Sequence, residues 1–342
     1  MEHNQFLGDC DFLASAPYTT LKTLGLGFVD VGVRDGIHPI VAPIAGLTSA
    51  LAFEPDQAEC VRLQNLYANS TPWKEVWIEP SALYESNGTK TLHITSASTN
   101  TSLRHVHDPF VERYEMEKFQ PIGMEQVVTR TLDDVLATQF ASHPQLGEFI
   151  KLDTQGTEFE ILMGARKTLT DRTVALLVEV WYCQTYDGQK LFSDIEIFLR
   201  SQGFSFYGAS VHYRSRKFLD KCQHVTKERP LWADAVFFRD PLPGSFVPIS
   251  LNERQVHVLF TCAMLLGSYD FALELAQSTW ADGKEHDRIA RFVHKISRVS
   301  RWDAVLSALK LAGEAVISPK RAQITLGKFI DARRDVCNYE EV

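Results

Sequence analysis

The stretch FIKLDTQGTEFEILMGA, residues 149–165, carries the strongest indication of how this chain folds. An apolar run ends at polar residues, Gly156 permits a tight turn, and apolar side chains then recur at helical spacing up to Gly164. This pattern predicts a buried strand followed by a helix. Reactive groups of open α/β sheets lie beyond the carboxyl ends of parallel strands, so the polar residues here are predicted to belong to a site. They are Lys151, Asp153 and Gln155.

Two upstream stretches repeat this arrangement, FVDVGVRDG at residues 28–36 and AFEPD at residues 52–56. Glycines in the first allow a ligand to approach the backbone, although a simple turn between strand and helix has the same pattern. Glu54 in the second is placed to accept both hydroxyls of a ribose, and its alternative role is helix capping. The Gly-x-Gly-x-x-Gly fingerprint is absent, which counts against NAD and favours a nucleotide-type cofactor without a pyrophosphate.

Strand-like runs alternate with helical patterns between residues 26 and 239, and the last two strands have no helix between them. The order predicts an α/β fold with a mostly parallel sheet and one antiparallel edge strand. Residues 86–103 are rich in Ser, Thr and Asn, which predicts a hairpin followed by a mobile loop.

The chain is expected to have three parts. Residues 1–27 form a lead-in, residues 28–245 form the α/β domain, and residues 246–342 form a C-terminal helical module after the linker PLPGS at 241–245. A weak 33-residue repeat pairs Val256 with Ile289 and Tyr269-Asp270 with Trp302-Asp303. Two degenerate helix hairpins are therefore predicted, packed against the sheet domain or against a second subunit.

Composition limits the partners and the compartment. A net charge of −8 argues against a general nucleic-acid binder. The sequence contains no run of ~18 apolar residues, so a membrane span is not expected. A cytoplasmic location is expected, because the N-terminus has no signal-peptide pattern and the cysteines are scattered without zinc-type spacing. These cysteines are Cys10, Cys60, Cys183, Cys222, Cys262 and Cys337. The sequence has no compact set of metal-ligating residues, so a metal site is not expected.

Several further side chains have two interpretations each. Lys151 and Asp153 point to one face because strand side chains alternate, and they form either a site edge or an ion pair that fixes the strand end. His105 and His107 are candidate general bases or an exposed pair. A cationic face predicted for a C-terminal helix is either solvated or a binding surface for an anion or a partner. It is formed by Arg288, Arg291, Lys295 and Arg298.

Taken together, these stretches resemble the FkbM family of S-adenosylmethionine-dependent methyltransferases over roughly residues 25–240. The resemblance rests on the three stretches above, on ALYESNG (82–88) with its following polar loop, and on TRTLDDVL (129–136). It implies a class I methyltransferase (Rossmann-like) fold, with seven strands of which the last is antiparallel and with helices on both faces. It also implies S-adenosylmethionine as the cofactor.

The resemblance also assigns cofactor-binding roles to the loops after the first three strands. It implies a methionine end lined by Asp30, Gly32 and Gly36, a ribose held by Glu54, and an adenine flanked by Ser81 and Ala82. Asp153 is then expected near the sulfonium and the acceptor. The family commonly has Ala-Asn where this chain has Val33-Arg34, which places Arg34 beside the methionine end. The C-terminal helices lie outside the resemblance.

The expected function is methylation of a hydroxyl on a sugar, a glycan or another small polar metabolite. An alcohol needs a base to remove its proton, and Asp153 is the first choice, with His105 and His107 as rivals. One alternative is an NAD-dependent oxidoreductase. Another is a non-catalytic partner-binding protein on a degenerate methyltransferase fold. The C-terminal helices also allow a homo-oligomer.

Overall fold

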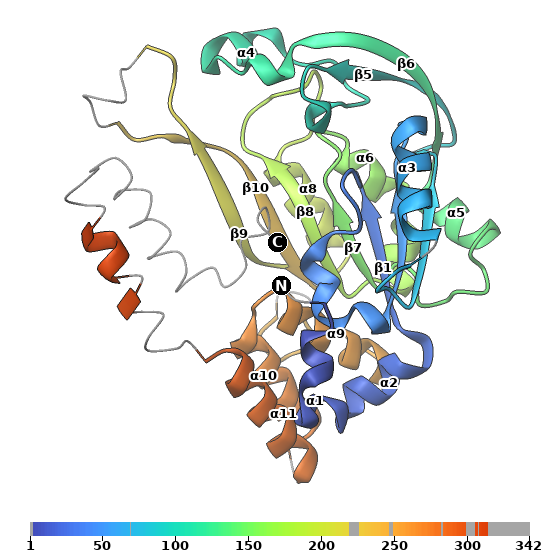
Figure 1. The fold of residues 1–342 in the computed structure, drawn as a ribbon, viewed down its shortest axis with the longest axis vertical. Coiled ribbons are helices and arrows are strands. Elements are labelled where there is room, and N and C mark those ends of the chain that lie inside the picture. The colour runs from blue at the N-terminus through green and yellow to red at the C-terminus, as the bar shows by residue number, and fades with distance from the viewer. Residues whose placement is uncertain are drawn as a thin grey trace.

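The computed structural model describes residues 3–68, 70–218, 226–245, 249–281, 283–298, 305–306 and 308–313. A twisted central sheet lies between helices on its two faces, and a layer of helices closes its lower end (Figure 1). The seven strands of this sheet confirm the expected mostly parallel α/β fold. In spatial order they are β3 (Glu75–Glu79), β2 (Thr48–Phe53), β1 (Leu26–Val31), β7 (Phe149–Leu152), β8 (Ala175–Trp181), β10 (Arg229–Phe238) and β9 (Ser205–Arg214).

The expected position of the antiparallel strand is wrong. β10 is antiparallel to both β8 and β9, and it lies between them, so the edge strand is β9. The crossover through α8 (Phe192–Ser201) leads from β8 to β9, and β10 pairs between the two. The apolar residues at the end of β10 are buried, as befits an inner strand, whereas β9 is only partly buried.

A second, three-stranded sheet holds β4 (Ala82–Leu83), β6 (Pro121–Arg130) and β5 (Gly88–Thr95), in the order β4-β6-β5. It lies at the top of Figure 1. The hairpin expected within residues 86–103 is limited to one antiparallel bridge, between His93 and Ser102. The main partner of β5 is β6, which pairs antiparallel with it and follows α4 (Asp108–Tyr114) in the chain. The intervening residues include a short 3₁₀ helix, η3 (Ser98–Asn100).

Apolar residues form one large core on each face of the main sheet. One core contains side chains of α5 (Leu132–Thr138), α6 (Glu158–Met163), α7 (Arg166–Asp171) and α8. The helix expected to end at Gly164 is α6, which ends at Met163, and α7 begins at Arg166. A Cβ at Gly164 would lie 2.2 Å from the Tyr84 carbonyl oxygen, so the glycine allows this helix end to pack on the backbone of the small sheet.

The other core joins N-terminal helices and helices that follow β10 to the sheet. It combines α3 (Gln57–Ala68) and the 3₁₀ helix η2 (Pro39–Leu47) with these two groups of helices. The latter are α1 (Cys10–Leu13), α2 (Ala16–Leu24), α9 (Glu253–Leu265), α10 (Tyr269–Thr279) and α11 (Lys284–Ile296). Residues 257–265 of α9 are all buried, so this helix is part of the core that supports the sheet.

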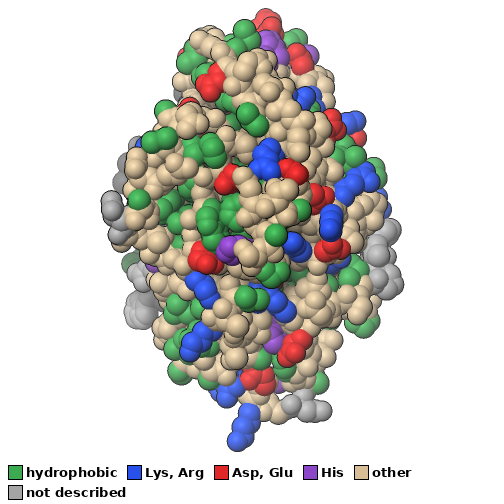
Figure 2. Space-filling view, turned by 90° about the vertical axis from the view of Figure 1, so that its right-hand side faces the viewer, with side chains coloured by type: hydrophobic (Ala, Val, Ile, Leu, Met, Phe, Trp, Pro, Cys, Tyr) green, Lys and Arg blue, Asp and Glu red, His purple; other side chains and the backbone are tan. Residues whose placement is uncertain are grey.

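Of the predicted repeat, Trp302-Asp303 lies outside the described residues, as do Cys222 and Cys337. The other four cysteines are free thiols. Within the described ranges, no helix is long and apolar enough to cross a membrane. Charges of both signs are interspersed over the face shown in Figure 2, without a large patch of one sign.

Candidate active site

A pocket lies where β1, β2 and β4 end, with a cavity volume of about 160 Å³. Its other walls are formed by Ser98, Thr99 and residues 101–103, and by the turn between β7 and α6. Seven of the predicted site residues line it: Gly32, Arg34, Glu54, Ser81, Ala82, Asp153 and Gln155. The loops after separate strands therefore converge on one pocket at the carboxyl edge of the sheet, where α/β proteins bind ligands.

Glu54 follows β2 and is only 5% exposed. Its Oε1 accepts a hydrogen bond from the backbone N–H of Asp56 at 2.9 Å, which supports the carboxylate from one side. Burial raises the pKa of Glu54 to about 7. A buried carboxylate is stabilised by any ligand that donates hydrogen bonds to it, and the two hydroxyls of a ribose form such a pair of donors.

Gly32 and Ser81 also fit a nucleoside cofactor. Gly32 has a φ of +87°, and a Cβ there would lie 1.9 Å from the Asp153 carbonyl oxygen, so a side chain would separate the β1 and β7 loops. The Ser81 Oγ is buried in the pocket wall and has no hydrogen-bond partner among the described residues. A ligand heteroatom would satisfy this hydroxyl.

Arg34 bridges two walls of the pocket. Its Nη1 donates to the Ser98 carbonyl oxygen at 2.8 Å, and its own carbonyl oxygen accepts from Arg62 Nη2 at 2.8 Å. The residue that departs from the family pattern therefore connects the β1 loop to η3.

Two of the residues predicted to bind the cofactor, Asp30 and Gly36, do not line the pocket. Both instead support the loop that follows β1. Gly36 has a φ of +130°, and a Cβ there would lie 2.7 Å from the Tyr67 hydroxyl. The Asp30 Oδ2 accepts from the His38 backbone N–H at 2.7 Å, so this carboxylate holds the loop after β1.

Lys151 lies beneath the site and is 8% exposed. Its Nζ is 3.6 Å from Asp30 Oδ1 and 3.6 Å from Asp153 Oδ2. Burial lowers the pKa of Lys151, but the surrounding carboxylates, Asp30 first, more than compensate, and the net shift is upward. Lys151 is thus a charged ion-pair partner of both aspartates.

Two acidic residues that were not predicted extend the site. Glu179 on β8 and Asp234 on β10 lie opposite one another in the antiparallel ladder. His212 on β9 has its Nε2 3.4 Å from Asp234 Oδ2. Burial, and next the charge of Asp153, raise the pKa of Glu179 well above its usual range. The sequence did contain a feature that could have identified these two residues, because each is the only acidic residue within an otherwise mostly apolar strand.

His105 and His107 do not line the pocket. Their Nδ1 atoms lie 3.5 and 2.9 Å, respectively, from the carboxylate oxygens of Asp187, which is exposed. The two histidines therefore share a surface carboxylate. This geometry weakens both as rivals of Asp153 for the role of base.

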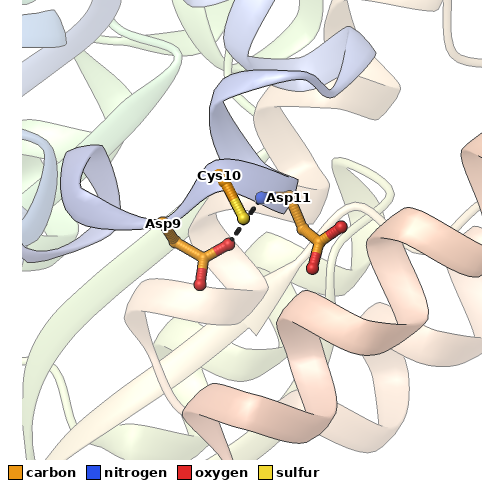
Figure 3. A group of neighbouring side chains, drawn as sticks. All are labelled: Asp9, Cys10 and Asp11. Carbon is orange, nitrogen blue, oxygen red and sulfur yellow. Dashed lines mark hydrogen bonds between the residues drawn. The ribbon is translucent and has the colours of Figure 1, made fainter.

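In the described part of the chain, one group of side chains has metal-ligand spacing: Asp9, Cys10 and Asp11 (Figure 3). These carboxylates already have protein partners. Asp9 Oδ1 accepts from the backbone N–H groups of Asp11 and Phe12 and caps α1, while its Oδ2 accepts from Lys295. Asp11 pairs with Arg291 at 2.8 Å. Part of the cationic face of α11 thus binds the N-terminal segment.

The sheet order defines a Rossmann-like protein, and its pocket lies at the carboxyl edge of the sheet. The family model of the methyltransferase FkbM domain matches residues 30–206, slightly more than half of the 342 residues. The chain belongs to this family of methyltransferases, whose cofactor is S-adenosylmethionine. No curated protein matches the chain.

Among solved structures, the chain is similar to the methyltransferase FkbM from Methylobacillus flagellatus, with 17% identity and a TM-score of 0.35. That match covers 63% of this chain and 43% of the other, so it spans less than half of that protein. A second similar structure is the magnesium protoporphyrin IX methyltransferase from Synechocystis with bound S-adenosylmethionine. It has 10% identity, a TM-score of 0.30, and coverage of 66% of this chain and 78% of the other.

Proposed function

We propose that this protein transfers a methyl group from S-adenosylmethionine to a hydroxyl of a neutral, polyhydroxylated acceptor such as a sugar or a glycan. The observation that supports this acceptor class is the acidic edge of the site. Asp153 directly follows β7, Glu179 and Asp234 lie opposite one another on β8 and β10, and Lys151 is the cation among these acids. Carboxyl groups form hydrogen bonds with hydroxyls, and those that are ionised repel phosphorylated acceptors.

The pocket residues suit the cofactor in separate roles. Glu54 would hold the ribose, Ser81 and Ala82 would flank the adenine, and Gly32 would leave room for the methionine end. When bound, S-adenosylmethionine supplies a methyl group already activated by its sulfonium. The task left to the protein is to align the acceptor oxygen, and such alignment can supply about 7–11 kcal/mol of a barrier.

Asp153 is the residue best placed to accept the acceptor's proton. Its side chain is 39% exposed, it lines the pocket, and it is held from below by Lys151. As the acceptor oxygen is methylated, its proton passes to the Asp153 carboxylate. General-base assistance of this kind contributes typically ~10²–10⁴-fold in rate.

A labelled-methyl assay tests this function. The full chain is incubated with S-adenosylmethionine carrying a deuterated methyl group, and with matched pairs of methyl glycosides and sugar phosphates. The proposal expects S-adenosylhomocysteine to form and the label to appear on an oxygen of a neutral glycoside. Asp153→Asn should abolish transfer even at S-adenosylmethionine concentrations that saturate the variant. Label on a nitrogen, or transfer to the phosphorylated members alone, would contradict the proposal.

A further inference from the structure

The side-chain amide of Gln155 lies at the centre of the site and contacts both carboxylates beside it. Its Nε2 donates to Asp153 Oδ1 at 2.9 Å and to Glu179 Oε2 and Oε1 at 3.0 and 3.1 Å. Its Oε1 accepts from the Tyr186 hydroxyl at 2.9 Å. Only this orientation of the amide pairs every donor with an acceptor.

Gln155 also contacts the wall of the pocket. Its carbonyl oxygen accepts from Ser102 Oγ at 2.7 Å, and Tyr186, which it binds, also donates to the Asn100 carbonyl oxygen at 3.3 Å. The backbone φ of Gln155 is +58°, a conformation that a residue with a side chain rarely adopts. Positions of this kind persist where surrounding contacts hold them, and they concentrate at functional sites.

The charges around this amide explain why its NH₂ group matters. Asp153, Glu158 and Asp234 all act electrostatically on Glu179, which the amide contacts, and Lys151 is the cation near Asp153, Asp234 and Glu179. Tyr186 is fully buried against the same group. Two carboxylates that share one donor are drawn together, whereas without the donor they repel each other.

We propose that Gln155 is a positioning residue, which fixes the Asp153 carboxylate at the pocket edge and joins it to Glu179 and to the pocket wall at residues 100–102. This inference rests on the proposed function, because the position of Asp153 matters only if Asp153 serves the transfer. If the inference holds, a substitution of Gln155 that alters the arrangement of the Asp153 and Glu179 carboxylates also alters the affinity for the cofactor.

The test compares Gln155→Glu with Gln155→Ala, by calorimetric titration with S-adenosylhomocysteine at about pH 6 and about pH 8.5. In Gln155→Glu, the protonated form of the new carboxyl group carries one O–H donor, whereas its ionised form only repels Asp153 and Glu179. The affinity of Gln155→Glu relative to wild type is therefore expected to fall at least about tenfold further at the higher pH. The loss in Gln155→Ala should be the same at both.

Gln126→Glu is the matched control, because Gln126 is exposed on β6 and its side chain donates a hydrogen bond to Thr91 Oγ1, far in sequence from the pocket residues that follow β7. It should bind as wild type does. Equal losses for Gln155→Glu at both pH values, or no loss in either Gln155 variant, would overturn the inference while leaving the proposed function standing. If wild type fails to bind, the proposed function fails. The inference, which rests on the proposed function, then fails with it.

Discussion

Asp30 and Lys151 lie directly opposite one another in the β1–β7 ladder, and the Lys151 Nζ is 3.6 Å from Asp30 Oδ1. Both side chains are buried, at the point where the two central strands reach the site. Asp30 therefore balances the positive charge of the buried Lys151 directly beneath Asp153, without a contribution from solvent or from a ligand.

Lys151→Met should destabilise the protein by about 3–5 kcal/mol, because removing one partner leaves buried carboxylates without a counter-charge. Urea denaturation at neutral pH measures this loss. Lys118→Met, at an exposed position, is the control and should change stability by less than about 0.5 kcal/mol. A loss below about 1 kcal/mol in Lys151→Met would show that the ion pair does not support the strand ends.

The stability of the ligand-free protein should depend on pH through Glu54. Burial raises the folded pKa of Glu54 from 4.5 to about 7, so its stabilising contribution is complete below pH 4.5 and is lost as pH rises through 7. Relative to Glu54→Gln, wild type should lose about 3 kcal/mol over that interval. Denaturation curves of both proteins at several pH values measure the difference. If the stabilities of wild type and Glu54→Gln changed with pH in parallel, the conclusion that burial disfavours the ionised Glu54 carboxylate would be contradicted.

Gly32→Ala should damage both folding and cofactor binding. A Cβ would lie 1.9 Å from the Asp153 carbonyl oxygen, and the φ of +87° is strained for alanine. A destabilisation of at least about 1–3 kcal/mol is expected, with weaker binding of S-adenosylhomocysteine. Gly208→Ala is the control, because a Cβ there meets nothing within 4 Å. Equal stability of the two variants would refute the close approach of the loops.

We also propose that the C-terminal helices are required for the sheet domain to fold. Arg254 on α9 donates to both Glu148 oxygens, at 2.6 and 2.9 Å, and to the Gly25 carbonyl oxygen at 2.6 Å. A fragment ending at residue 245 would lack Arg254, so the Glu148 carboxylate would lose its ion-pair partner. It would also expose to solvent the apolar core that α9 covers. It should lack a cooperative unfolding transition, and Arg254→Met in the full chain should cost about 3–5 kcal/mol. A fragment that melts like the intact protein would disprove this role.

Local sequence patterns were enough to predict the main strands and the pocket walls. β1, β2 and β7 are apolar runs that end at glycines or acids, and these ends place Gly32, Glu54 and Asp153 around one pocket. Such runs are local features, and the carboxyl-edge rule then brings their ends together.

Features set by pairing between distant segments were not predictable in the same way. β5 pairs with β6 across α4, and Glu179 meets Asp234 only because β10 lies inside the sheet. The central place of Gln155 depends on Tyr186 and Ser102 reaching it from other loops. No spacing in the sequence encodes these contacts, because each depends on the register of strands far apart in the chain.

Calorimetric titration of the full chain with S-adenosylmethionine and S-adenosylhomocysteine, with NAD as control, tests the central claim most directly. The account predicts dissociation constants of about micromolar order for both sulfur compounds and no binding of NAD. It also predicts about tenfold or greater weakening in Glu54→Gln, which loses charge-assisted hydrogen bonds to the ribose. If neither sulfur compound binds, or if NAD binds in their place, the assignment of this pocket to S-adenosylmethionine is contradicted.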